Sequence, residues 1–200
     1  MKRSKKASAN ACADPVLPDK CLVDTNVPII ANQASRTPQP GDRPDECVKA
    51  CINAILHVID EKRRGLILDA NGEILKEYRK NLKSSGQPGV GDHFLKWVLT
   101  YQSSLPEHQI VPINKRGDSY EEFPLHEKLK DFDRSDQKFI AVANAYGKKK
   151  KAPILQATDS KWWGWKEALS EVGIEVIFLC PEYVERKFTE KFPNHERNLQ

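Results

Sequence analysis

Carboxylate residues stand directly after three apolar runs that have the character of buried strands. Asp24 follows the run CLV, Asp69 ends the run GLILD, and Asp159 follows PILQAT. In a parallel sheet, the carboxyl ends of the strands and the beginnings of the following helices lie at one edge. We therefore expect these acids to converge in space, although they are far apart in the sequence.

Four more acids lie on two of the expected helices, three of them near a helix start. Glu73 and Glu77 belong to NGEILKEYRKNL, and Asp133 and Asp136 open DRSDQKFIAVANAYG. Like charges in one cleft repel each other, and a divalent cation removes that conflict. Carboxylates without His or Cys neighbours suit Mg²⁺ or Mn²⁺. Helix capping explains a single acid at such a position, whereas four or more favour a metal site.

Apolar residues at alternating strand and helix spacing predict the elements that position these acids. Because strands alternate with helices, the fold class is α/β, specifically a three-layer α/β/α domain with a central parallel sheet. Strands are expected at residues 21–23, 65–69, 109–113, 153–158 and 174–180. Helices are expected at residues 27–31, 46–64, 71–82, 92–105, 133–147 and 160–173, with loops at 84–91 and 114–123.

The composition fits a soluble globular protein, with 39% hydrophobic and 30% charged residues. No apolar run is long enough to span a bilayer, so a cytoplasmic protein without membrane partners is expected. Residues 1–19 are expected to be a basic, disordered tail, residues 20–182 the folded domain with 84–130 as an extended insert, and 183–200 a polar C-terminal tail. The five cysteines include no CxxC pair, which predicts reduced, buried thiols rather than a zinc site.

Four segments resemble, in this order, the motif series of the PIN-domain nucleases. They are DTNVPIIA, ILKEYRKNL, DRSDQKFIAVANAYG and ILQATDSKWWGW, and the resemblance runs from about residue 20 to residue 182. It implies a PIN-like fold and a metal-dependent endoribonuclease in which acids hold one or two Mg²⁺ or Mn²⁺ ions.

The resemblance also implies which acids act. Asp24 matches the acid that ends the first strand, and Glu77 matches the acid in the helix after the second strand. Asp136 matches the acid three residues before the run FIAVA, and Asp159 matches the acid after the threonine of a later strand. Glu73 lies one helical turn before Glu77, so the choice of the second acid stays open. Possible auxiliary residues are Asp133, Thr158, Ser160 and again Glu73.

The expected activity is cleavage of single-stranded RNA by water that the carboxylate-bound metal activates. The family's usual roles imply a toxin or defence effector, and an antitoxin, another regulatory protein or a second copy of the chain as partners. Two alternatives stay open. One is a catalytically silent PIN-like module that binds RNA or protein, and the other is a structure-specific DNA nuclease that uses segment 84–130 as a clamp.

Two further features of the sequence are expected to serve structure. The basic run Lys148–Lys151 should lie at the sheet edge opposite Asp159 and be solvated. Of Trp162, Trp163 and Trp165, two are expected to pack in the core, which leaves one that could stack on a base.

Overall fold

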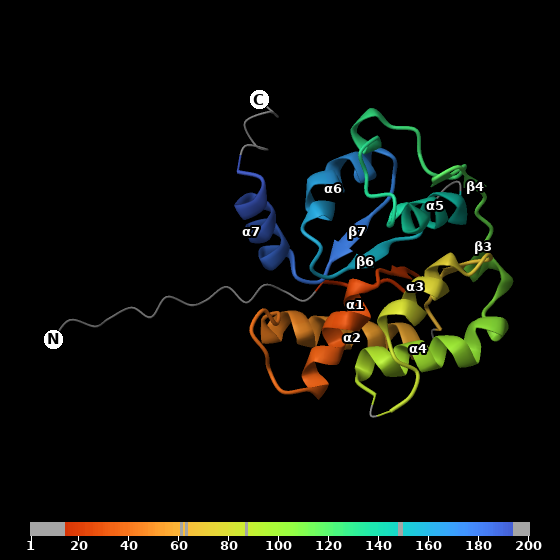
Figure 1. Ribbon diagram of the computed structural model, residues 1–200. Helices are drawn as coiled ribbons and strands as arrows, with labels where there is room; N and C mark the ends of the chain where they lie inside the picture. The colour runs from red at the N-terminus through yellow and green to blue at the C-terminus, as the bar shows by residue number, and fades with distance from the viewer. Residues whose placement is uncertain (1–14, 61, 63, 87, 148–149, 194–200) are drawn as a thin grey trace.

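The computed structural model describes residues 15–60, 62, 64–86, 88–147 and 150–193 (Figure 1). Within these residues the chain has a mixed α/β fold with small parallel sheets. Most of the expected N-terminal tail, Cys12, and Lys148 and Lys149 of the basic run lie outside the described residues. None of the described helices is both long and apolar enough to cross a membrane.

Five short parallel strands form the centre of the fold. β1 (Leu22–Val23), β6 (Ile154–Gln156) and β7 (Val176–Phe178) make one sheet in the order β1-β6-β7. β2 (Leu68–Asp69) pairs in parallel with β3 (Ile110–Val111). A parallel bridge between Cys21 and Leu66 joins the two sheets. The strands therefore follow one another in space as β3, β2, β1, β6, β7.

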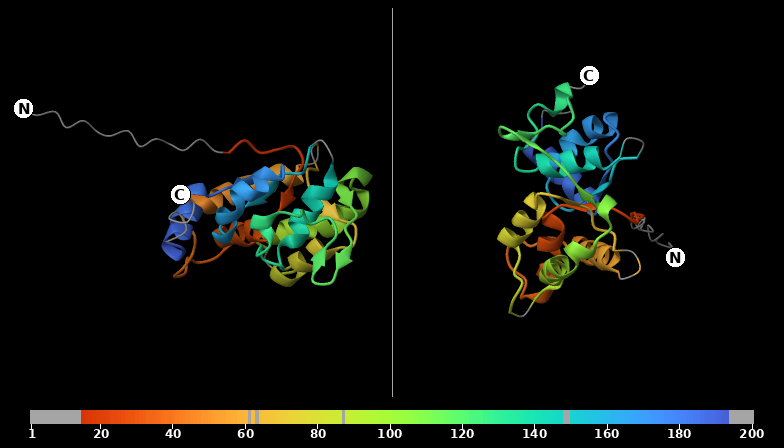
Figure 2. Two further views of the ribbon diagram at one scale, coloured as in Figure 1. Left: turned by 90° about the horizontal axis from the view of Figure 1, so that it is seen from above. Right: turned by 90° about the vertical axis from the view of Figure 1, so that its right-hand side faces the viewer.

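Two groups of helices lie on either side of these strands in Figure 1 and in the right-hand view of Figure 2. The first group contains α1 (Asn26–Ala31), α2 (Asp45–Ile59), α3 (Glu73–Asn81) and α4 (Val90–Tyr101). The second contains α5 (Gln137–Tyr146), α6 (Lys161–Glu171) and α7 (Pro181–Lys191). The helices expected from the sequence are present, and their ends differ from the expected ends by a few residues.

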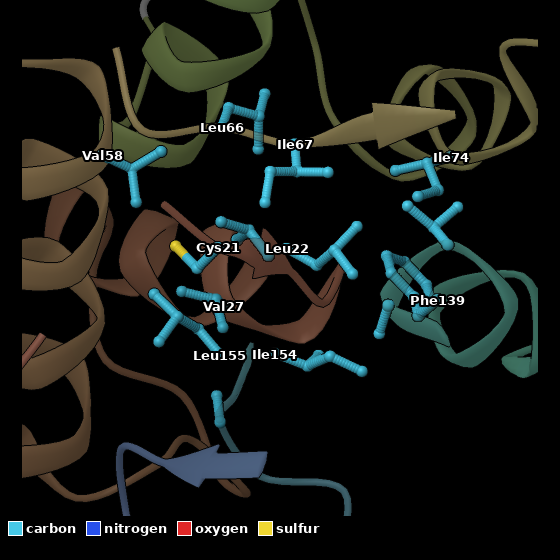
Figure 3. Close-up of a cluster of buried hydrophobic side chains, with 14 of the residues drawn as sticks. Cys21, Leu22, Val27, Val58, Leu66, Ile67, Ile74, Phe139, Ile154 and Leu155 are labelled. Carbon is cyan, nitrogen blue, oxygen red and sulfur yellow. The ribbon is translucent and has the colours of Figure 1, made fainter. Parts of the chain in front are cut away.

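The hydrophobic core joins the strands to both helix groups. Figure 3 shows Leu22 of β1, Val27 of α1, Ile67 before β2 and Phe139 of α5 in one cluster, and all four are fully buried. The prediction of buried, reduced thiols is confirmed for the four described cysteines: Cys21, Cys47, Cys51 and Cys180. Burial raises the pKa of Cys21 to about 12, so its thiol stays neutral.

Segment 84–130 carries more structure than the sequence predicted. It contains α4, β3 and an antiparallel hairpin of β4 (Lys115–Arg116) and β5 (Ser119–Tyr120). The sequence predicted α4 and β3, but it predicted a loop at 114–123, where the hairpin forms. Two residues, Gly117 and Asp118, connect the strands, and Gly117 has a φ of 61°. Two-residue hairpin turns require a positive φ, which glycine adopts without steric cost.

The sequence predicted a polar tail from residue 183, and this prediction is wrong for the residues up to 191, which belong to the helix α7. Pro181 begins this helix, a position where its missing N–H costs nothing. Val184 and Phe188, four residues apart, are buried on one face, and α7 packs against α6. The segment is polar in composition, but these two apolar residues form a narrow stripe on one face of the helix. Residues 183–191 therefore belong to the folded domain.

Candidate active site

The carboxyl ends of β1 and β6 meet at the point where the strand order reverses. From β1 the chain continues to β2 and β3 on one side, whereas β6 and β7 lie on the other. Such a reversal opens a crevice outside the carboxyl ends of parallel strands, where ligands bind. Asp24 follows β1 directly, and Thr158 and Asp159 follow β6. The carboxyl ends of β1 and β6 are therefore the candidate active site.

Asp24 is buried and is held by both neighbouring elements. Its backbone N–H donates to the Leu155 carbonyl at 2.9 Å. Its Oδ1 accepts hydrogen bonds from the Asn26 N–H at 2.9 Å and from Gln156 Nε2 at 3.3 Å. The bond from Asn26 gives the capping interpretation a structural basis, since Thr25 at the N-cap position makes no capping bond with its side chain.

The charge of Asp24 is unfavourable where it stands. Burial raises the pKa of Asp24 from 3.8 to about 8, the negative charges of Asp136 and Glu77 add to the rise, and the hydrogen bonds from Asn26 oppose it. These two acids come from α3 and from the start of α5, far from Asp24 in the sequence. The fold thus places three of the predicted acids within electrostatic reach of one another.

Glu77 is the acid of α3 that lies beside Asp24. Thr25 Oγ1 donates to Glu77 Oε1 at 2.5 Å, and Lys138 of α5 forms an ion pair with Glu77 Oε2. Glu73 points elsewhere, because its carboxylate pairs with Lys76 at 2.6 Å and with Lys115 of β4 at 2.9 Å. The geometry therefore favours Glu77 over Glu73 as the second acid.

Asp136 stands at the N-cap position of α5 without capping it through its side chain. Trp162 Nε1 of α6 donates to Asp136 Oδ2 at 2.9 Å. Burial raises the pKa of Asp136 to about 6, the bond from Trp162 lowers it, and the charges of Asp133 and Asp159 raise it again. The carboxylate is thus fixed by an indole of another helix rather than by its own helix.

Asp159 and the expected auxiliary residues lie at the margin of the site. Asp159 Oδ1 accepts the Lys161 N–H at 2.9 Å, as a cap at the start of α6 would. Asp133 accepts from Ser135 and pairs with Lys161 at 3.2 Å. Ser160 is buried, and its Oγ accepts from Lys191 Nζ at 3.2 Å. Thr158 is buried next to Asp159.

Asp69 shows that a strand-end acid is not necessarily part of the site. Its two carboxylate oxygens accept the N–H groups of Glu73 and Ile74 at 2.7 and 2.8 Å. Asp69 therefore caps α3 and satisfies two of the donors that begin every helix.

The sequence interpretation missed three residues that fix the acids. Lys138 pairs with Glu77, Gln156 donates to Asp24, and Trp162 donates to Asp136. Lys138 was recognisable as a charged residue at the start of the apolar run FIAVA. Trp162 is fully buried, while Trp163 and Trp165 are half-buried against Phe178 and Phe132.

The donor set suits a hard divalent cation, because it consists of carboxylate oxygens alone. Burial, together with the negative charges of Asp136 and Glu77, raises the pKa of Asp24, so a bound cation would favour its ionised form. Among the described residues, however, no group of three or more His, Cys, Asp or Glu side chains lies close enough to hold a metal ion. Asp24, Glu77 and Asp136 fit the cation by chemistry, and a closed cage requires their side chains to move together.

The chain matches no protein-family model, no curated protein and no solved structure.

Proposed function

We propose that this chain is a metal-dependent endoribonuclease with a three-layer, PIN-like α/β/α fold, which cleaves single-stranded RNA at the carboxyl ends of β1 and β6. One observation carries the proposal. Asp24, Glu77 and Asp136 approach one another from three elements, so that burial and mutual repulsion raise the pKa of Asp24 to about 8. Strongly raised pKa values of this kind concentrate at functional sites.

In this proposal, Asp24, Glu77 and Asp136 hold the cation, and Asp159 lies at the margin. Bound Mg²⁺ or Mn²⁺ supplies positive charge that neutralises a phosphate oxygen and favours ionisation of water. Gln156 orients Asp24, Thr25 orients Glu77, and Trp162 orients Asp136. Lys138 adds a fixed positive charge beside Glu77, which favours the approach of a phosphate group. No side-chain nucleophile is needed.

Cleavage of labelled single-stranded RNA and DNA in parallel, with Mg²⁺, Mn²⁺ or EDTA, tests the proposal. We expect metal-dependent cleavage of RNA by the wild type and a loss of several orders of magnitude in Asp24→Asn. Asp69→Asn is the matched control. It changes another buried strand-end aspartate and keeps one of the two oxygens that accept N–H groups of α3. Asp69→Asn should therefore lose stability, while its folded form should cleave like the wild type.

A second candidate function is RNA binding without turnover. The ion pair between Lys138 and Glu77 favours it, since this pair neutralises one of the acids without any metal. Mn²⁺ titration separates the two functions. A catalytic centre binds the ion and loses that binding in Asp24→Asn, whereas a silent module binds RNA equally well with Mn²⁺ or with EDTA. Preferential cleavage of branched DNA would instead support the structure-specific DNA nuclease.

A further inference from the structure

A cleft of about 590 Å³ leads from the surface to the candidate active site. One wall is α3, with Lys76 and Lys80, and the other is the hairpin β4–β5, with Lys115 and Tyr120. Figure 1 shows β4 near α5 and above α3. Glu77 and Lys138 line both this cleft and the candidate active site. Asp24 and Asp136 are not part of its lining, so the cleft reaches the candidate active site at Glu77.

Basic side chains outnumber acidic ones along this cleft. Glu73 is paired with Lys76 and Lys115, and Glu77 is paired with Lys138. Asp118 of the hairpin turn pairs with Arg134 at 2.8 Å. Every acid of the cleft is thus neutralised by at least one cation. Lys80 makes no ion pair with any residue that the structure describes, so a positive surplus remains for an anionic ligand.

The two walls of the cleft touch each other. Lys115 of the hairpin reaches Glu73 of α3 at 2.9 Å, so this ion pair bridges the gap. Because this contact narrows the cleft, we expect a single strand to enter it more readily than a duplex, which carries paired bases between two backbones. A single strand can follow it, with phosphates near the lysines and a base against the half-buried ring of Tyr120.

A second hollow adjoins the cleft at Arg134. It has a volume of about 630 Å³, lies along the hairpin and shares Asp118, Ser119 and Arg134 with the cleft. Arg116, which has no ion-pair partner among the described residues, lines this second hollow together with the exposed Leu125. A ligand that passes Arg134 can therefore extend over both hollows, which suits a strand of several nucleotides rather than a single small anion.

We propose that single-stranded RNA approaches the acids along the cleft between α3 and the hairpin β4–β5, with Lys80, Lys115 and Arg134 contacting its phosphates. This inference rests on the proposed function and deepens it. It assigns a role to part of segment 84–130, because the hairpin supplies one wall of the substrate path.

Lys80→Gln and Lys49→Gln form the decisive pair of variants. Each removes one exposed helical lysine that has no ion pair within the described part of the chain, Lys80 in the cleft and Lys49 on α2. Binding of a labelled RNA oligonucleotide is measured in EDTA over a salt series, and KM and kcat are measured with Mn²⁺. Circular dichroism and thermal melting establish that each variant is folded.

Lys80→Gln should weaken RNA binding roughly threefold to tenfold and lower the salt slope by about 0.7. KM should rise by a similar factor while kcat stays unchanged. Lys49→Gln should match the wild type, and Lys115→Gln and Arg134→Gln should act like Lys80→Gln. A duplex RNA of the same sequence should bind more weakly than the single strand.

The outcomes separate this inference from the proposed function. If the wild type cleaves RNA but Lys80→Gln and Lys49→Gln behave alike, the cleft is not the substrate path and the nuclease stands. If no metal supports cleavage but Lys80→Gln alone weakens RNA binding, the cleft is confirmed as the RNA-binding path and the proposed nuclease activity is wrong. Equal binding of duplex and single strand would overturn the single-stranded occupant.

Discussion

Lys138 and Glu77 form an ion pair that is largely shielded from water. Only 9% of the Lys138 side chain and 23% of the Glu77 side chain are exposed, and Lys138 also donates to the Ser135 carbonyl. The lysine therefore provides a positive charge beside the acids in the absence of a cation. A cation that binds Glu77 has to compete with Lys138, so this pair opposes metal binding and stabilises the metal-free protein.

Removal of Lys138 should destabilise the metal-free protein. Lys138→Met leaves Glu77 without its partner, and breaking a buried ion pair costs about 3–5 kcal/mol. Urea denaturation in EDTA measures this loss. Mn²⁺ should restore more stability in Lys138→Met than in the wild type, and the double variant with Glu77→Gln should recover much of the loss. Wild-type stability of Lys138→Met in EDTA would contradict the stabilising role.

Asp136→Asn separates metal binding from the structural contact with Trp162. If Asp136 holds the cation, cleavage should fall by orders of magnitude while the fold persists, and RNA binding should survive or tighten because a negative charge is lost. If Asp136 serves only as the acceptor for Trp162 Nε1, the amide oxygen of Asn can take over that role and activity should be preserved. Cleavage assays and RNA titrations measure both effects, with Asp133→Asn as the control because Asp133 already pairs with Lys161. Unchanged cleavage by folded Asp136→Asn would exclude Asp136 from the site.

The stability of the metal-free protein should depend on the ionisation of Asp24. Its folded pKa of about 8 lies above the ordinary value of 3.8, so the fold favours the protonated form. The stabilising contribution of Asp24 is complete below about pH 4 and is lost as the pH rises through 8. Asp24→Asn cannot ionise, so its stability relative to the wild type should rise over this window.

Each unit of pKa shift corresponds to about 1.4 kcal/mol, so the relative gain of Asp24→Asn should reach a few kcal/mol. Denaturation of both proteins in EDTA, at several pH values between the two pKa values, measures the difference. Asp69→Asn in parallel controls for the loss of a buried aspartate outside the site. A difference that does not change with pH would refute the raised pKa of Asp24.

Mn²⁺ should raise the melting temperature, and more strongly at high pH. Protons and the cation compete for Asp24 and Asp136, whose pKa values of about 8 and about 6 are both raised by burial. At a concentration 100 times its Kd, a ligand adds about 2.7 kcal/mol of stability. Differential scanning fluorimetry with and without Mn²⁺ tests this. A melting temperature unchanged by Mn²⁺ at every pH would speak against a metal site.

The apolar pattern was sufficient to predict the helices α1 to α6 and the five parallel strands, and with them the positions of Asp24 and Asp136. It could not distinguish Asp24 from Asp69, because both acids end a buried strand before a helix. The difference lies in geometry: the N–H groups of α3 point at both oxygens of Asp69, whereas Asp24 faces acids from two other helices. Such contacts between distant segments cannot be read from the spacing of residues within one segment.

The missed elements have related physical causes. The hairpin β4–β5 has only two residues per strand, too few for an alternating pattern to be recognised. The apolar stripe of α7 is carried by Val184 and Phe188 among charged neighbours. The choice between Glu73 and Glu77 depended on Thr25, Lys115 and Lys138, which lie at least 38 residues away from the nearer glutamate along the chain.

The close approach of α7 to α6 has a practical consequence for defining the domain. A Cβ atom built on Gly164 would lie 2.7 Å from the Phe188 ring, and Lys191 reaches Ser160 at the start of α6. The same helix carries Trp162, which holds Asp136. Truncation of the chain at residue 180 would therefore remove none of the acids of the site. It would, however, remove the contacts that α7 makes with α6, and α6 carries the Trp162 that holds Asp136. Any fragment that is prepared for an activity assay should retain α7, or an inactive fragment will be mistaken for an inactive protein.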